Sequence, residues 1–216
     1  MIDLLLSRVP FVVVLWLSLS VHEWAHARVA FALGDGTALG LGRMTLDPFA
    51  HLDPIGTFLL PLLGVPMGWA KPVPVNPAGF SRRIPMSLGM LLTAAAGPAS
   101  NVVLAVGASI LWLGLVTVGP EAGNGRFADL ALLGVQFNVA LAVFNLLPIP
   151  PLDGSRIVNH FLPRDLRGPW ERVESMGTIF PVLFYLALVM AGLDPITPML
   201  EGVDGVLASL RDMLAG

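Results

Sequence analysis

The sequence predicts an all-α polytopic membrane protein, a helical bundle of about four to six membrane segments with a re-entrant or short-strand region near residues 37–83. Of the 216 residues, 55% are hydrophobic and only 12% are charged, whereas soluble domains carry about 25% charged residues. The mean hydropathy is +0.78, and apolar runs long enough to cross a bilayer recur along the chain. No internal repeat or polar appended domain interrupts them, so we expect one domain over residues 1–216.

The charge and the cysteine count exclude several classes of function. The net charge of −3 gives no indication of a nucleic-acid partner. The chain has no cysteine, which excludes disulfides, thiolate metal sites and cysteine nucleophiles. The apolar N-terminal run is long and lacks a small-residue cleavage site, so we interpret it as a retained helix rather than a signal peptide.

The first half of the chain predicts one long helix and a non-helical excursion. The helix covers about residues 2–33 and ends at "GDG". Residues 37–53 are polar and interrupted by glycine, as in a loop or short strands. The apolar run near residues 54–68 would make a helix of roughly 20 Å, which is shorter than the roughly 30 Å of hydrocarbon and favours a re-entrant or interfacial segment. Prolines keep residues 69–83 extended.

The second half predicts further apolar helices. One covers about residues 84–118, and another covers 127–147 before it breaks at "PIPPLDG" and resumes over 155–162. A last span is expected at 176–193, within a C-terminal pair of helices at 173–216. The final stretch has the amphipathic pattern of an interfacial helix.

Basic residues predict the orientation of these helices. Lys71, Arg82 and Arg83 precede the 84–118 helix. The residues after the 127–147 helix are Arg156, Arg164, Arg167 and Arg172. The turn between the two helices has one arginine, Arg126. Cytoplasmic loops are enriched in Lys and Arg, so both basic regions are expected in the cytoplasm. The N-terminus would then be external.

The most unusual stretch of the first helix is "HEWAH". His22 and His26 are four residues apart, so they share one helix face and can reach one Zn²⁺. Glu23 is rotated by about 100° from them, where it can act as a base beside a metal. The alternative is a pair of core histidines bonded to neighbouring helices. Ionisable groups inside a membrane segment are by default functional candidates, which favours the metal site.

A catalytic zinc needs a third protein ligand, and Asp153 in "IPPLDGSR" is the best candidate. Prolines break the helix before it, and broken helices at membrane depth are tolerated where they line a cavity. An ordinary helix N-cap explains Asp153 equally well from its local sequence. Depth in the membrane favours the ligand interpretation of Asp153, because the predicted orientation brings the histidines and Asp153 to the same cytoplasmic half of the bilayer. The other histidines, His51 and His160, are interpreted as structural or solvated.

Four segments together resemble the site-2 proteases, a family of intramembrane zinc metalloproteases. They are "HEWAH", "AAAGPASN", "FNLLPIPPLDGSR" and "GWAKPVPVNP", and the resemblance covers about residues 15–160. The absence of an inserted PDZ domain and of a following CBS domain resembles the small bacterial type. The resemblance implies one Zn²⁺ held by His22, His26 and Asp153, with Glu23 as the general base.

The resemblance also implies further site residues. Asn145 would hold the substrate carbonyl or the oxyanion, and Asn101 would line the site. The extended loop over residues 71–76 would pair with an unfolded stretch of substrate, through the residues Lys71, Val73, Val75 and Asn76. The residues themselves suit strand addition, since both valines can donate their N–H groups. A rigid proline-rich connector remains an equal alternative from the sequence alone.

The predicted function is that of a zinc-dependent endopeptidase that cleaves transmembrane proteins within the bilayer, as in regulated intramembrane proteolysis. The expected partners are a transmembrane protein substrate and the lipid bilayer, with no nucleic acid. The expected location is a bacterial plasma membrane, with the active site nearer the cytoplasm. Two alternatives remain: a metal transporter that uses the same ligands, although such proteins usually show repeated halves, and an inactive relative that binds membrane partners.

Overall fold

The computed structural model describes residues 2–63, 68–118, 125–163, 165–166, 168, 170, 179–194 and 196–215. Within these ranges every regular element is helical, and no strand occurs. The main helices are α1 (Ile2–Ala32), α4 (Met86–Val118), α6 (Arg126–Leu146), α7 (Asp153–Phe161), α9 (Ile179–Met190) and α10 (Thr197–Ala215). Shorter helical turns are α2 (Thr37–Gly40), η1 (Pro48–His51), η2 (Pro54–Leu59), α3 (Leu60–Leu62) and η3 (Pro77–Gly79).

Within the described residues, three helices are long and apolar enough to span a membrane, over Ser7–Ala32, Met86–Thr117 and Arg126–Leu146. The predicted all-α polytopic membrane class is therefore confirmed. The predicted last span begins outside the described residues, and its described part is the 12-residue α9. The bundle carries exposed aliphatic side chains, among them Val103 and Ile110 of α4 at 71% and 67% exposure. Such a surface suits a lipid environment, where apolar surface has no cost.

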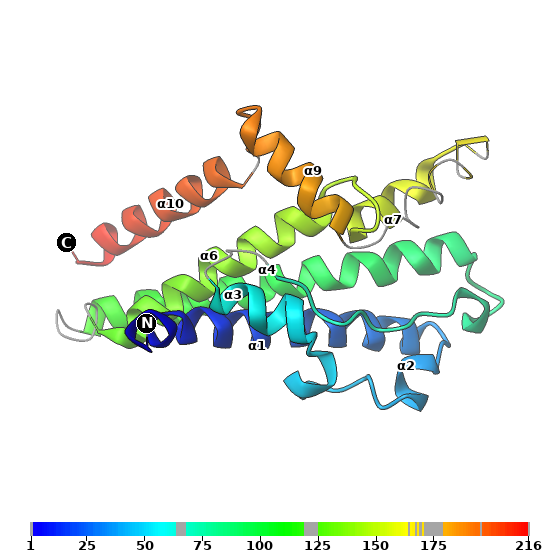
Figure 1. The fold of residues 1–216 in the computed structure, drawn as a ribbon, viewed down its shortest axis with the longest axis horizontal. Coiled ribbons are helices and arrows are strands. Elements are labelled where there is room, and N and C mark those ends of the chain that lie inside the picture. The colour runs from blue at the N-terminus through cyan, green and yellow to red at the C-terminus, as the bar shows by residue number, and fades with distance from the viewer. Residues whose placement is uncertain are drawn as a thin grey trace.

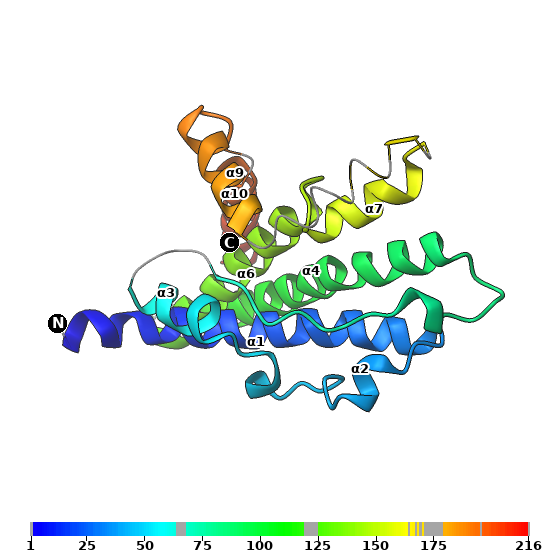
Figure 2. The same ribbon diagram turned by 45° about the vertical axis from the view of Figure 1, so that its right-hand side comes forward.

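The three long helices form an antiparallel core (Figures 1 and 2). The C-terminal end of α1 and the N-terminal end of α4 lie together, and α6 runs back along α4 towards that same end. One buried cluster joins α4, α6 and α10, with Trp112, Val135 and Leu207 at its centre. A second joins α1 and α6 through Leu15, Leu19 and Leu141.

The excursion between α1 and α4 contains helical turns and extended chain. Of the loop or short strands predicted at residues 37–53, the structure has a loop with two helical turns, α2 and η1, and no strand. Asp47 starts η1 by accepting a hydrogen bond from the Phe49 N–H at 3.0 Å, so the local side chain directs the chain into a turn. The nine residues of η2 and α3 would be about 13 Å long, too short to cross a bilayer.

Candidate metal centre

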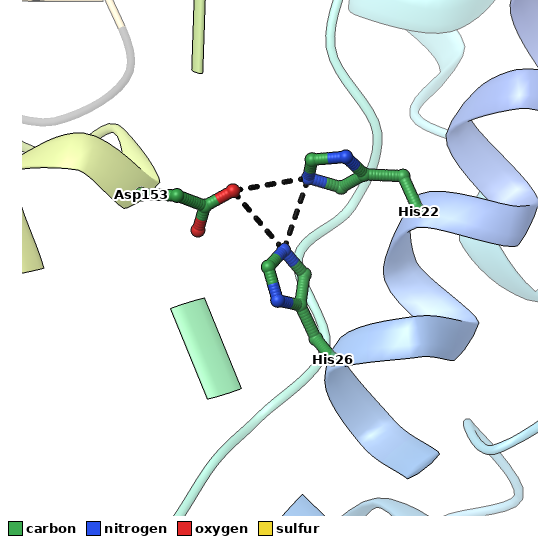
Figure 3. A group of neighbouring side chains, drawn as sticks. All are labelled: His22, His26 and Asp153. Carbon is green, nitrogen blue, oxygen red and sulfur yellow. Dashed lines mark hydrogen bonds and ion pairs between the residues drawn. The ribbon is translucent and has the colours of Figure 1, made fainter. Parts of the chain in front are cut away.

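His22 and His26 project from one face of α1 towards Asp153, which approaches from the other side (Figure 3). The two Nε2 atoms are 3.0 Å apart, and each is 3.2 Å from Asp153 Oδ2. Ligands about 2.0–2.1 Å from one tetrahedral ion would lie about 3.3 Å from each other. The three atoms thus have the spacing of a zinc ligand set, and all three residues are buried.

The break between α6 and α7 brings Asp153 to the histidines. The chain turns at residues 147–152, and Asp153 is the first residue of α7 rather than its N-cap. The N-cap residue is Leu152, and no side chain caps this helix. The N-cap interpretation of Asp153 is therefore wrong. A Cβ at Gly154 would overlap the carbonyl oxygens of Leu146 and Leu147, so only glycine lets α7 start this close to the end of α6.

The other ring nitrogens of the histidines are held by hydrogen-bond acceptors. His22 Nδ1 is 2.6 Å from Asn101 Oδ1, and His26 Nδ1 is 2.7 Å from the Thr93 carbonyl oxygen. A neutral imidazole with its proton on Nδ1 presents a lone pair at Nε2. Metal-binding histidines are usually oriented in this way by an acceptor behind the ring.

The three facing atoms need a cation between them. Asp153 Oδ2 is fully buried and accepts no hydrogen bond from the part of the chain that the structure describes. Two imidazole lone pairs and a carboxylate oxygen repel one another at 3.0–3.2 Å unless a positive charge neutralises them. The His₂Asp set with this geometry fits Zn²⁺.

Helix α4 closes the back of this site through Gly97. A Cβ at this position would overlap His26 Nε2 and would lie 2.6 Å from His22 Cε1. Glycine is therefore required where α4 passes the two rings. Pro98 follows it inside the helix and is fully buried.

A cavity of about 170 Å³ opens in front of the three candidate ligands. Glu23 lines it beside them, and the carboxylate Oε2 accepts a hydrogen bond from the Val73 N–H at 2.7 Å. Its other wall is apolar and includes Leu141, Phe144 and Val75. A buried carboxylate next to a metal site and an open cavity form the arrangement expected of a hydrolytic centre.

Comparisons with known proteins agree with this geometry. Residues 113–188 match the model of Peptidase family M50. The chain is 41% identical over 208 residues to "Putative zinc metalloprotease YwhC" of Bacillus subtilis, which covers 94% of this chain and 91% of that protein. It is 34% identical over 173 residues to "Putative zinc metalloprotease Rip2" of Mycolicibacterium smegmatis, covering 79% and 64% respectively. No solved structure matches.

The chain belongs to peptidase family M50, the site-2 proteases. The predicted family is confirmed, and with it a multi-pass membrane protein. Family membership and the names of its relatives support a zinc metallopeptidase. The matched range includes Asn145 and Asp153 and begins after His22 and His26 in the sequence.

The extended loop of this M50 protein is tied down at both ends. The Arg43 guanidinium donates to the Lys71 carbonyl at 2.6 Å, and the Asn76 N–H donates to Asp35 Oδ2 at 2.7 Å. Burial alone would raise the pKa of Asp35, but hydrogen bonds from Thr37 and the Asn76 N–H hold this pKa below its usual range. These contacts fix the position of residues 71–76 over the cavity.

The predicted loop residues divide into two groups. Val73 and Val75 line the cavity, as expected of residues that meet a substrate. Lys71 and Asn76 do not line it, and their backbones make the anchoring contacts instead. The Val73 N–H was predicted to donate to a substrate, but in the structure it donates to the Glu23 carboxylate. The Val75 N–H has no partner among the described residues.

The two predicted asparagines also differ. Asn145 lines the cavity, and its Nδ2 donates to the Leu141 carbonyl at 3.0 Å. Asn101 has no exposed surface and lies behind His22, so its position suits holding the ring rather than meeting substrate. His51 is buried and bonded to the Thr45 carbonyl at 2.8 Å, in agreement with a structural role.

Sequence reasoning missed two residues at this site. Asn138 of α6 hydrogen-bonds to Asn101, and Arg156 of α7 lines the cavity. An asparagine inside an apolar membrane helix was a detectable signal for Asn138, because such groups are costly in lipid unless they are paired. Arg156 looked like one of several cytoplasmic basic residues, and only the fold separates it from them.

Proposed function

We propose that this protein is an intramembrane zinc-dependent endopeptidase that hydrolyses peptide bonds of transmembrane protein substrates. The observation that carries the proposal is the convergence of His22, His26 and Asp153 on one point beside Glu23. The two histidines and Glu23 lie in α1, a helix apolar enough to span a membrane. Ionisable groups at such depth are expensive and mark functional sites.

Each group in the cavity has a chemical task in this reaction. Zn²⁺ held by the His₂Asp set supplies Lewis-acid polarisation of the scissile carbonyl and acidifies water. Glu23 takes a proton from the attacking water and later delivers it to the leaving amine. Asn145 lines the same cavity, which supports the proposal that it contacts the carbonyl under attack.

The extended loop gives the substrate a backbone partner. Residues 73 and 75 line the cavity, and the Val75 N–H is available to a substrate carbonyl. An extended substrate segment can add to such a chain by strand pairing. A transmembrane helix must first unwind, because its amides are already bonded within the helix. Helix-breaking residues near the cleaved bond should therefore favour cleavage.

The distribution of charge supports a site near the cytoplasm. Most basic residues of the described chain lie near the end of α1, before α4 or after α6, namely Arg28, Arg43, Lys71, Arg82, Arg83 and Arg156. The end of α1 and the start of α4 lie together at one end of the bundle (Figure 1). The other described basic residues are Arg8 near the start of α1, Arg126 at the start of α6 and Arg211 near the end of α10. Cytoplasmic ends are the more basic, so this end would face the cytoplasm of a bacterial plasma membrane.

The test uses purified full-length protein in detergent or vesicles. We expect the wild type to contain zinc and to cleave a panel of transmembrane substrates, while Glu23→Gln keeps the zinc and loses cleavage by about a hundredfold or more. Glu201→Gln is the matched control, since Glu201 is exposed on α10 away from the cavity. Zinc flux into vesicles that survives Glu23→Gln would instead identify a transporter. Zinc binding by the wild type without any cleavage would identify an inactive relative.

A further inference from the structure

A chain of buried amides runs behind His22 and joins three helices. His22 Nδ1 lies 2.6 Å from Asn101 Oδ1 of α4, and Asn101 Nδ2 donates to Asn138 Oδ1 of α6 at 2.8 Å. Asn138 Nδ2 then donates to Ser18 Oγ of α1 at 2.9 Å and to the Gly134 carbonyl at 2.8 Å. The two asparagines are 0% and 4% exposed, so water does not compete with these bonds.

The direction of each bond in this chain is determined. The Gly134 carbonyl can only accept, so the amide nitrogen of Asn138 must face it and the Asn138 oxygen must face Asn101. Asn101 therefore turns its nitrogen to Asn138 and its oxygen to His22. An oxygen acceptor at 2.6 Å requires the ring proton on His22 Nδ1, which leaves the lone pair on Nε2.

We propose that Asn101 and Asn138 are positioning residues that fix the ring orientation and the tautomer of His22, so that its Nε2 is held ready for the metal. The proposal rests on the zinc site of the proposed function. Asn101 acts directly on the ring, and Asn138 acts through Asn101. The Gly134 carbonyl of α6 thereby determines, through Asn138 and Asn101, that Nε2 of His22 presents its lone pair.

The two histidines depend on different kinds of partner. His26 Nδ1 bonds to the backbone carbonyl of Thr93, which no side-chain substitution can delete. His22 relies on side chains alone, so substitutions can loosen it selectively. Neither asparagine lines the cavity, so neither can act by contacting a substrate there.

The experiment measures the zinc affinity of the purified full-length protein by competition with a chromogenic chelator. Asn101→Leu should weaken zinc binding about 10–100-fold, the usual cost of losing a partner behind a metal-binding histidine. Asn101→Asp keeps an oxygen acceptor for His22 Nδ1 but replaces the donor to Asn138 Oδ1 by a second oxygen, so it should recover part of the lost affinity. Asn138→Leu should weaken binding less than Asn101→Leu, because Asn101 then loses its orientation but keeps its oxygen.

Ser100→Ala is the matched control. Ser100 precedes Asn101 on the same helix, and its hydroxyl bonds only to the Gly97 carbonyl of its own helix, at 2.7 Å. This variant should bind zinc as the wild type does. Thermal unfolding of the metal-free variants separates the two roles, since a merely structural network would lower the melting temperature and leave zinc affinity unchanged.

The possible results divide clearly. Wild-type zinc affinity in Asn101→Leu, or equal losses in Asn101→Leu and Asn101→Asp, overturns the positioning role. If Asn101→Leu does not fold, Asn138→Leu and Asn101→Asp give the same decision. A wild type that binds no zinc overturns both this inference and the proposed function, whereas one that binds zinc but cleaves nothing overturns the proposed function alone.

Discussion

At the scale of single residues, Glu23 shows how the site uses its extended loop. One oxygen of the carboxylate is held by the Val73 N–H at 2.7 Å, and the side chain lines the cavity beside the metal ligands. Hydrogen bonds to a charged group are stronger than those between neutral groups. The loop therefore positions the proposed base from behind, while the next valine along it remains available to a substrate.

Replacing the two valines by proline separates these roles. Both positions lie in extended chain directly after a proline, where proline is tolerated, and the change removes one N–H group in each case. Val73→Pro should lower kcat about tenfold or more, because Glu23 loses a charge-assisted hydrogen bond. Val75→Pro should instead raise KM, since it removes a donor to the substrate. Steady-state kinetics on one peptide substrate measure both, and an unchanged kcat in Val73→Pro would contradict the positioning of Glu23.

Which site residues could be predicted depended on how far apart they lie in the sequence. His22, Glu23 and His26 form a local helical pattern, so their shared geometry follows from the 3.6-residue period. Asp153 could be found because a proline-broken helix at membrane depth restricts the choice. The bond from Val73 to Glu23 spans 50 residues and the bond from Asn138 to Asn101 spans 37. Such contacts depend on helix packing, which no local pattern encodes.

At the scale of elements, α4 forms the back wall of the metal site. The sequence predicted this helix, including a glycine and a proline within it, but could not show that Gly97 faces the two histidines. The long helices were predictable because sustained apolar runs determine them. The form of residues 37–53 was not, because their short apolar runs suit strands and helical turns equally. Local hydrogen bonds favour the turns there, such as the bond that the Phe49 N–H donates to the Asp47 carboxylate.

Adding a single methyl group to α4 tests this wall. Gly97→Ala should displace the His26 ring and weaken zinc binding by at least about tenfold, since the added Cβ overlaps His26 Nε2. Gly107→Ala is the matched control, because a Cβ there meets no atom within 4 Å. Zinc content after dialysis against a chelator, measured by atomic absorption, distinguishes the two variants. Equal zinc retention would show that α4 lies farther from the histidines than the structure indicates.

At the scale of the whole molecule, the bundle has two chemically different ends. The candidate ligands lie in the last third of α1 and at the start of α7, and most basic residues of the described chain lie near the end of α1, before α4 or after α6. The end of α1 and the start of α4 lie together (Figures 1 and 2). Water must reach a hydrolytic site, and a site near one end of the bundle needs only a short path. We therefore propose one orientation, with the N-terminus outside and the end that holds the candidate metal site in the cytoplasm.

The absence of cysteine makes this orientation directly measurable. Ala78 lies in the loop before α4 and Asp129 in the first turn of α6, and both are exposed. A membrane-impermeant thiol reagent added to intact spheroplasts should label Asp129→Cys and leave Ala78→Cys unlabelled until the membrane is permeabilised. The cysteine-free wild type provides the background. Labelling of Ala78→Cys before permeabilisation would reverse the orientation and place the metal site near the outer surface, where the positive-inside rule would no longer explain the basic end.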